Sequence, residues 1–298
     1  MRKINSAAMV VNAKSRKGQA LFEQARDIVR DFPFPVECHA VEDPRMLDET
    51  VIAALAKKPD ILILGGGDGT VSGLVDHLVH SDTALGVLPL GTANSFARTL
   101  GIPLTVEGAL DVIRQGNLKR IDLGMIDNDY YANCAALGIS PQIAETVPHN
   151  LKKYLGRVGY LGWAAWQYVK FRPFTLIVDD GSDVTRMRVV EVRISNGGFH
   201  GGTELVEHAE VDSGEIIVQA VRGGVKRNLI WSWFASATKL EARHATLMHF
   251  TGKNLKVDTI PRLPISIDGE VLAHTPVVAK VAAGVIEVAV PPETSPPA

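Results

Sequence analysis

The stretch ILILGGGDGT, residues 61–70, constrains the fold more than any other part of the sequence. Four apolar residues lead into a glycine-rich turn, and apolar residues at helical spacing follow it. The glycines permit positive φ angles and let a ligand approach the backbone closely. Backbone N–H groups and the helix dipole converge at such a turn, which predicts an anion-binding site. Asp68 is unexpected there, because its carboxylate would repel an anion.

The first 125 residues alternate segments of strand character with segments of helical periodicity. Strands are predicted at 7–12, 36–41, 61–64 and 84–91, and helices at 19–32, 48–58, 68–79, 92–101 and 105–116. This alternation predicts a Rossmann-like α/β domain whose parallel sheet is covered on both faces. Ligands of such sheets bind beyond the carboxyl ends of the strands, where the glycine turns would meet.

The pattern changes after about residue 120. Short strand-like runs separated by Gly, Asp, Asn and Pro turns predict an antiparallel β-sandwich or barrel, of which we favour the sandwich. We therefore divide the chain into an α/β domain at 1–125 and a β-sandwich domain at 126–290. The Pro-rich residues 291–298 are expected to form a disordered tail.

Two further turns repeat the arrangement of the first. LPLGTANSFAR, residues 88–98, and VVNAKSRKGQALFEQA, residues 10–25, each place small and polar residues between a strand and a helix. Three such turns on neighbouring strands would build a nucleotide cradle. The polar and glycine residues that these two turns contribute are Asn12, Ser15, Gly18, Gly91, Thr92 and Asn94.

Composition narrows the choice of function and compartment. Thirty-one basic and thirty-three acidic residues leave a formal charge of −2, so no global excess of positive charge argues for nucleic acid. The two cysteines, Cys38 and Cys134, have no metal-ligand spacing and fit a reducing compartment. No stretch approaches the roughly 20 apolar residues of a membrane span. We expect a cytoplasmic protein. Any contact with a membrane would be peripheral and at its inner face.

Three N-terminal motifs carry a family resemblance: NAKSRKG at 12–18, GGDGT at 66–70 and PLGTANSFAR at 89–98. Together they resemble the diacylglycerol kinase catalytic family, in particular its soluble bacterial lipid kinases. NGGFHGG at 196–202 and ISIDGEVL at 265–272 extend the resemblance over nearly the whole chain. It implies ATP-dependent, Mg²⁺-assisted phosphorylation of a hydroxyl of diacylglycerol or a related lipid alcohol. The nucleotide would lie between the two domains, and the second domain would bind the lipid.

The resemblance also implies roles for particular residues. Asp268 and Glu270 fall on the acidic pair from which the general base is assigned, and Asp68 joins them as a candidate catalytic residue. If the carboxylate of Asp68 lay 4 Å from a phosphate charge in the cradle, their repulsion would cost roughly 4 kcal/mol at an effective dielectric of 20. Mg²⁺ bridging, a hydrogen bond from a hydroxyl, or capping of the following helix would each resolve that repulsion. The residues on nucleotide-binding positions are Asn12, Ser15, Gly66, Gly67, Asp68, Gly69, Thr70, Gly91, Thr92 and Asn94.

The chain departs from the family pattern at several positions. Ser213 stands where the family has an aspartate that helps to hold a structural Mg²⁺, so Asp212 and Glu215 become the candidate metal ligands through a shift in register. Ser95 replaces another aspartate. The other departures are Ala13, Arg16, Val41 and Ser72.

Two segments combine basic residues with aromatic side chains, at 149–172 and 222–234. Such a mixture is typical of segments that lie on anionic lipid, which favours peripheral membrane contact with the lipid substrate. Packing of the aromatic rings against the sandwich would explain the same pattern. His200, His208, His244 and His249 have no carboxylate or cysteine at ligand spacing, so we interpret them as surface or core residues.

Two alternatives remain at this stage. One is a different small-molecule kinase on the same cradle, of which NAD kinase is the nearest. The other is a lipid- or nucleotide-binding regulator without catalysis, which Ser95 and Ser213 favour. The sequence does not specify the oligomeric state.

Overall fold

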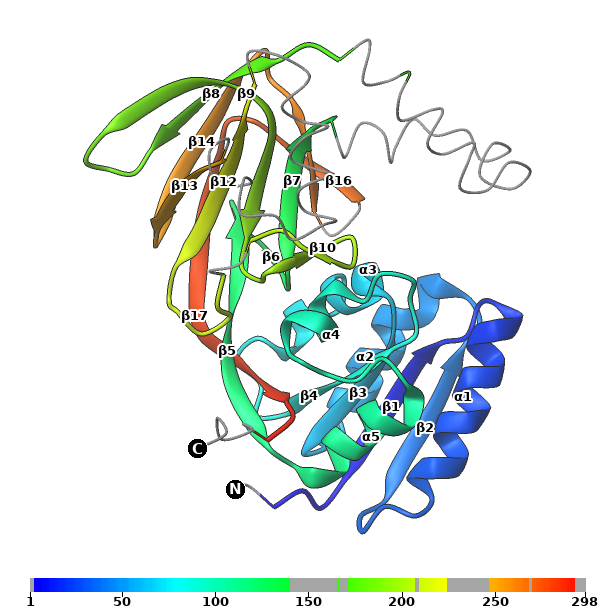
Figure 1. Ribbon diagram of the computed structural model, residues 1–298. Helices are drawn as coiled ribbons and strands as arrows, with labels where there is room; N and C mark the ends of the chain where they lie inside the picture. Colours follow the sequence, from blue (N-terminus) through cyan, green and yellow to red (C-terminus); the bar gives the residue numbers. More distant parts are fainter. Residues whose placement is uncertain are drawn as a thin grey trace, which may run out of the picture.

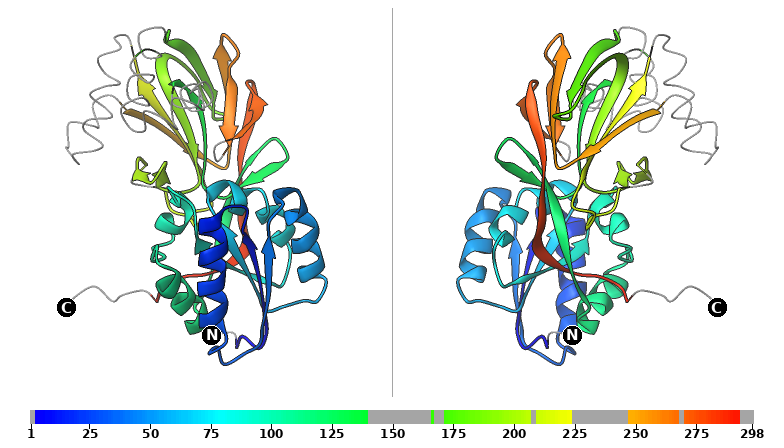
Figure 2. Two further views of the ribbon diagram at one scale, coloured as in Figure 1. Left: turned by 90° about the vertical axis from the view of Figure 1, so that its right-hand side faces the viewer. Right: turned by 90° about the vertical axis from the view of Figure 1, so that its left-hand side faces the viewer.

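The computed structural model describes residues 3–139, 166, 171–206, 209–223, 247–267 and 270–292. These residues form two units that one continuous sheet connects (Figure 1). The first unit contains the N-terminal helices and parallel strands. The second contains antiparallel strands and lies beyond one end of the first (Figure 2).

The first unit is built on a parallel sheet of order β2-β1-β3-β4. Its strands are β1 (Ala7–Asn12), β2 (Val36–Val41), β3 (Ile61–Gly66) and β4 (Ala84–Pro89). Its helices are α1 (Arg16–Val29), η1 (Pro44–Met46), α2 (Leu47–Leu55), α3 (Asp68–Ser72), η2 (Val75–Leu78), α4 (Ser95–Thr99) and α5 (Val106–Gln115). The predicted Rossmann-like arrangement is confirmed.

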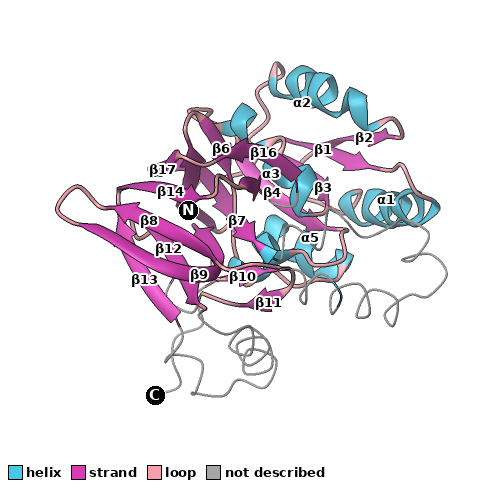
Figure 3. Ribbon diagram, turned by 90° about the horizontal axis from the view of Figure 1, so that it is seen from above, coloured by secondary structure: helices cyan, strands magenta, loops and turns pink. Residues whose placement is uncertain are grey.

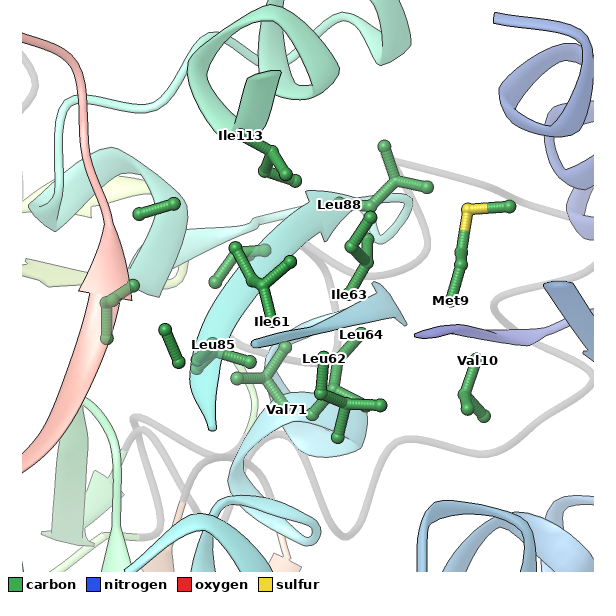
Figure 4. Packing of buried hydrophobic residues seen from close by; sticks show 14 of the residues in the cluster. Met9, Val10, Ile61, Leu62, Ile63, Leu64, Val71, Leu85, Leu88 and Ile113 are labelled. Atoms are coloured by element: carbon green, nitrogen blue, oxygen red, sulfur yellow. The ribbon is translucent and has the colours of Figure 1, made fainter. Parts of the chain in front are cut away.

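Side chains from β3 alternate between the two faces of this sheet (Figure 4). Ile61 and Ile63 point toward the α5 side, where Ile113 packs, whereas Leu62 and Leu64 point toward α3. All four strand residues have no exposed surface. A strand that is buried on both faces reads as a continuous apolar run, which is why ILIL could be recognised as a central parallel strand.

The second unit is an antiparallel sandwich, as predicted. Strand β9 bends so that its first half pairs with β8 and its second half lies between β7 and β12. The strands of this unit are β6 (Asp129–Tyr131), β7 (Cys134–Gly138), β8 (Phe174–Asp179), β9 (Val184–Ser195), β10 (Phe199–His200), β11 (Thr203–Glu204), β12 (Ile216–Arg222), β13 (Leu247–Gly252), β14 (Asn254–Ile260), β15 (Pro264–Ile267) and β16 (Glu270–His274). Seen from above, β8, β9, β12 and β13 lie beside one another at the end away from α1 and α2 (Figure 3).

Two long strands, β5 (Leu118–Ile126) and β17 (Val277–Ala289), run through both units as an antiparallel pair. β17 pairs with β14 near its start and runs parallel to β4 near its end. Its residues Val277 and Ala279 belong to the core of the second unit, whereas Ile286 and Val288 belong to that of the first. The chain therefore returns to the first unit after completing the second.

The structure differs from the expected elements in four places. The segment after the glycine turn is not one helix, because α3 stops at Ser72 and a separate 3-10 turn follows Gly73. α4 has five residues and is shorter than predicted. Strand β13 and the small β10–β11 hairpin were not predicted. Over the described part of the chain, no helix is long and apolar enough to cross a membrane.

Candidate functional site

The turns after β1, β3 and β4 lie at one edge of the first unit. These strands are neighbours and run parallel, so their carboxyl ends at Asn12, Gly66 and Pro89 reach the same edge of the sheet. The second unit lies beyond this edge, with β10 close to α3 and α4 (Figure 1). The predicted juxtaposition of the three motifs is therefore present.

The turns after β3 and β4 approach so closely that only glycine fits. A Cβ atom added to Gly91 would lie 2.5 Å from the Cα atom of Gly67. A Cβ atom on Gly66 would lie 2.5 Å from the Cβ atom of Thr70. The backbone N–H of Leu90 donates to the carbonyl oxygen of Gly66 at 2.9 Å, which joins the two turns directly. Bare backbone of this kind can surround a polyphosphate without steric conflict.

Asp68 connects the same two turns through its side chain. Its Oδ1 atom accepts a hydrogen bond of 3.0 Å from the backbone N–H of Phe96, in the first turn of α4. Asp68 is itself the first residue of α3, whose N-cap is Gly67 without a side-chain cap. A carboxylate at a helix N-terminus is favourable because the N–H groups there carry partial positive charge. Asp68 thus caps a helix, but the helix of the neighbouring motif and not its own.

Asn94 closes the turn after β4 from within. It adopts a left-handed conformation with φ of 47°, which asparagine tolerates better than most residues. Its Oδ1 accepts from the N–H of Gly91 at 2.8 Å, and its Nδ2 donates to the carbonyl of Gly91 at 3.0 Å. Asn94 is buried and Thr92 is exposed. Asn94 therefore shapes the loop, while Thr92 is available to a ligand.

The first turn contributes Asn12 and Ser15. Nδ2 of Asn12 lies 3.5 Å from Oγ1 of Thr70, so the turns after β1 and β3 also meet through side chains. Oγ of Ser15 accepts from the N–H of Gly18 at 3.0 Å and caps α1. Gly18 therefore lies inside the first turn of this helix, not before it as the sequence indicated.

Side chains of α4 hold the β10–β11 hairpin of the second unit against the first unit. The N–H of Gly202 donates to Oγ of Ser95 at 3.0 Å, and the N–H of Phe199 donates to Oγ1 of Thr99 at 3.4 Å. Nδ2 of Asn133 donates to the carbonyl of Phe199 at 2.5 Å. Ser95, which departs from the family pattern, thus has a structural partner. The NGGFHGG motif contains the residues that make this contact, but the motif did not indicate that their partners would lie on α4.

Of the predicted acidic pair, only Glu270 belongs to the described residues. Asp268 falls outside the described residues, and Glu270 is the first residue of β16, opposite Ile267. A pocket of about 330 Å³ separates the β15–β16 hairpin from α3. Its lining residues are Gly69, Ser72, Gly73, Asp76, Asp129, Tyr130, Ile267 and Leu272. Burial, and secondarily the charge of Asp129, raises the pKa of Asp76 in this pocket. The roles of Asp268 and Glu270 remain predictions.

The candidate metal ligands Asp212 and Glu215 lie in the segment that precedes β12, and Asp212 contacts the start of β5. Asp212 makes an ion pair of 2.7 Å with Lys119. Nearby, the buried Asp122 accepts hydrogen bonds from the N–H groups of Gly214 at 2.6 Å and Gly284 at 2.7 Å. Among the described residues no three His, Cys, Asp or Glu side chains gather as a metal site. The roles of Asp212 and Glu215 as metal ligands stay predictions, and the sequence analysis did not identify Asp122.

The two predicted membrane segments lie almost wholly outside the described residues. At their edges, Phe171 is buried and pairs edge-to-face with Phe174, with ring centroids 6.4 Å apart. Trp166 has 46% of its surface exposed.

Comparison with known proteins agrees with the architecture. Residues 6–126 match the diacylglycerol kinase catalytic domain, and residues 134–290 match the YegS C-terminal NAD kinase beta sandwich-like domain. A crystal structure of a diacylglycerol kinase from Bacillus anthracis superposes with a TM-score of 0.76 at 18% identity, covering 99% of this chain and 100% of that one. That likeness concerns the fold alone.

Two curated relatives span most of the chain. A diacylglycerol kinase from Staphylococcus aureus is 26% identical over 285 residues, which cover 89% of this chain and 85% of that protein. An uncharacterized protein from Synechocystis is 29% identical over 246 residues, which cover 78% of this chain. The chain spans only 55% of the length of the Synechocystis protein.

Proposed function

Since the chain belongs to the diacylglycerol kinase family and is a kinase, we propose that it transfers the γ-phosphoryl group of ATP to the hydroxyl group of a lipid alcohol. Diacylglycerol or a closely related lipid is the acceptor. The reaction takes place between the turns of the first unit and the β15–β16 hairpin of the second.

The close approach of Gly67 to Gly91 is the observation that carries this proposal. A side chain on Gly91 would displace the other turn, since its Cβ atom would lie 2.5 Å from the Cα atom of Gly67. A side chain on Gly67 would make a tight contact of 3.3 Å with the Cα atom of Gly91. The consequence is a stretch of bare backbone at the carboxyl ends of two parallel strands. A triphosphate fits such a surface, because its oxygens accept hydrogen bonds from several N–H groups at once.

In this mechanism the protein mainly positions its substrates. The turns after β1, β3 and β4 hold the phosphates, with Thr70 and Thr92 as hydroxyl donors. Asp68 fixes the relative position of two of these turns through Phe96. Asp268 accepts the proton of the lipid hydroxyl as its oxygen bonds to the γ-phosphorus, while the bond from that phosphorus to the bridging oxygen breaks and ADP leaves. Mg²⁺ bound with the nucleotide would supply positive charge against the phosphates.

A phosphoryl-transfer assay tests the proposal. The purified full-length chain is incubated with radiolabelled ATP and Mg²⁺ against diacylglycerol, other lipid alcohols and NAD in mixed micelles. We expect label on a lipid alcohol, and its loss in Asp268→Asn. Asp258→Asn is the matched control, because Asp258 lies on β14, away from the three turns.

Each alternative gives a different result in this assay. Label on NAD with none on any lipid would replace the lipid kinase by a NAD kinase, which the description of the second domain makes worth including. Nucleotide binding without transfer to any acceptor would indicate a non-catalytic regulator.

We also propose that the segments 149–172 and 222–234 bring the protein to the membrane surface. They carry basic residues and aromatic rings, which suit the interface of an anionic bilayer. Co-sedimentation with vesicles that contain anionic lipid should exceed that with neutral vesicles and should fall when Lys152 and Lys153 become glutamate. Equal sedimentation with both vesicle types would contradict this proposal.

A further inference from the structure

His200 is a titratable residue at the junction of the two units to which the mechanism above gives no role. It ends β10, and β10 packs against α4. Hydrogen bonds to Ser95 and Thr99 hold the hairpin on that helix. A Cβ atom added to Gly202 would lie 3.4 Å from the carbonyl oxygen of Ala93, inside the turn after β4. His200, two residues earlier, is therefore held beside the predicted phosphate cradle.

Charged groups of both units act on the imidazole electrostatically. They are Asp68 of the first unit and Glu191 and Arg193 of β9. α4 carries Arg98, whose Nε donates to Ala93, and β11 carries the exposed Glu204. The charges that act on His200 thus belong to both units: the carboxylate that joins two turns and a pair of charges in the sandwich.

The pair on β9 is buried and fixed. Glu191 and Arg193 have 0% and 2% of their surface exposed, and Oε1 of Glu191 lies 2.6 Å from Nη2 of Arg193. Nη1 of Arg193 donates to Oε1 of Gln219 at 2.6 Å, and Gln219 in turn donates to the carbonyl of Leu205. A buried pair held in this way keeps its orientation, so the field at His200 is part of the folded structure.

These surroundings determine the charge of the imidazole. Burial lowers the pKa of His200, and the positive charge of Arg193 lowers it further, while Glu191 and Asp68 act in the opposite direction. His200 is therefore mostly neutral at neutral pH in the free protein. An anion that arrives beside it would favour the protonated form.

We propose that His200 binds a phosphate group in the cleft and takes up a proton as it does so. The inference rests on the proposed function, since the phosphate belongs either to the nucleotide or to the phosphorylated lipid product. Binding and protonation are then linked: phosphate raises the affinity of the imidazole for a proton, and a proton raises the affinity for phosphate to the same extent.

The test is a histidine titration followed by NMR on the full-length protein labelled at the imidazole carbons. The NMR signal of the His200 imidazole is identified as the one that is missing in His200→Gln. The pKa of His200 is measured in the free protein, with a non-hydrolysable ATP analogue, and with a short-chain lipid phosphate. We expect at least one ligand to raise it. A rise of one unit would strengthen binding roughly tenfold between a pH well above the pKa of the complex and a pH well below the pKa of the free protein. The phosphate ligand also titrates in this pH range. Its contribution to the pH dependence of binding is the same for the wild type and for His200→Gln, so it cancels in the comparison of the two proteins.

Glu191→Gln tests the origin of the effect without touching the cradle. It removes a charge that favours the protonated imidazole, so the pKa of His200 should fall in the free protein. Should this buried variant fail to fold, the titrations of the wild type and His200→Gln still decide.

The outcomes separate the two proposals. If the ATP analogue binds while neither ligand changes the pKa of His200, this inference is overturned and the proposed function stands. If the wild type binds neither the ATP analogue nor the lipid phosphate at any pH, both are overturned. The ligand that moves the pKa identifies the source of the phosphate.

Discussion

Asp68 links two turns that are separated by almost thirty residues, since its partner is the N–H of Phe96. The bond fixes α4 to the glycine turn after β3. The bond also gives the carboxylate a favourable role at this site, because its negative charge compensates the positive N-terminal end of α4. The charge of Asp68 still lies next to the predicted phosphate site, and its structural and chemical roles can be separated by substitution.

Asp68→Ala should lower the free energy of unfolding by about 0.5–2 kcal/mol, as loss of a capping side chain does. Asp68→Asn retains an Oδ1 acceptor for Phe96, so it should keep most of the stability. We expect its phosphoryl transfer to fall by roughly a hundredfold, because the charge is lost from the site. Chemical denaturation and the kinase assay measure the two effects. Wild-type activity in folded Asp68→Asn would leave Asp68 with the capping role alone.

The contact between Gly67 and Gly91 makes a graded prediction. Gly91→Ala places a methyl group 2.5 Å from the Cα atom of Gly67 and should cost about 1–3 kcal/mol of stability. Gly67→Ala meets Gly91 at 3.3 Å and should cost less. Both should weaken nucleotide binding, which calorimetry measures. The reverse order of stability would show that the two turns do not pack as described.

At the level of elements, the β10–β11 hairpin depends on the side chains of α4. Ser95→Ala removes the acceptor for the N–H of Gly202 and should cost about 0.5–1.5 kcal/mol. Amide hydrogen exchange in residues 199–204 should accelerate. Ser195→Ala, also buried but on β9, is the control that should leave this exchange unchanged. Equal protection in both variants would mean that Ser95 does not hold the hairpin.

Local signals predicted some elements well. Thr105 caps α5 by accepting from the N–H of Gly108, and Gly116 ends the helix with φ of 70°. Both residues act within four positions of their partners, so the sequence pattern contains the whole interaction. The strand–glycine turn–helix motifs likewise predicted which turns meet, because parallel strands align their carboxyl ends.

Long-range contacts account for what the sequence did not predict. Asp68 was expected to serve a cation, a hydroxyl or its own helix, whereas its observed partner belongs to another motif. The hairpin at His200 is two residues per strand and has no periodicity to detect. In the sequence Asp122 cannot be distinguished from other polar residues of a strand, because its partners Gly214 and Gly284 are far away along the chain.

At the scale of the whole molecule, β17 joins the two units, since its end completes the core of the first. Ile286→Ala should therefore lower the stability of the first unit by about 2–5 kcal/mol, although Ile286 lies in the last strand. Truncation after Gly284 should prevent folding of the first unit, whereas removal of residues 293–298 alone should not. Thermal unfolding followed by circular dichroism compares these proteins. A stable first unit after the longer truncation would contradict this role of β17.

The course of β5 and β17 also has a consequence for the exchange of parts between relatives. The second unit is inserted into the first, since the chain leaves along β5 and comes back along β17. A chimaera that takes the second unit from another kinase therefore needs two junctions, one near Ile126 and one near Gly284, with the register of the β5–β17 pair preserved across both. A single crossover would leave the first sheet with a terminal strand from a foreign sequence.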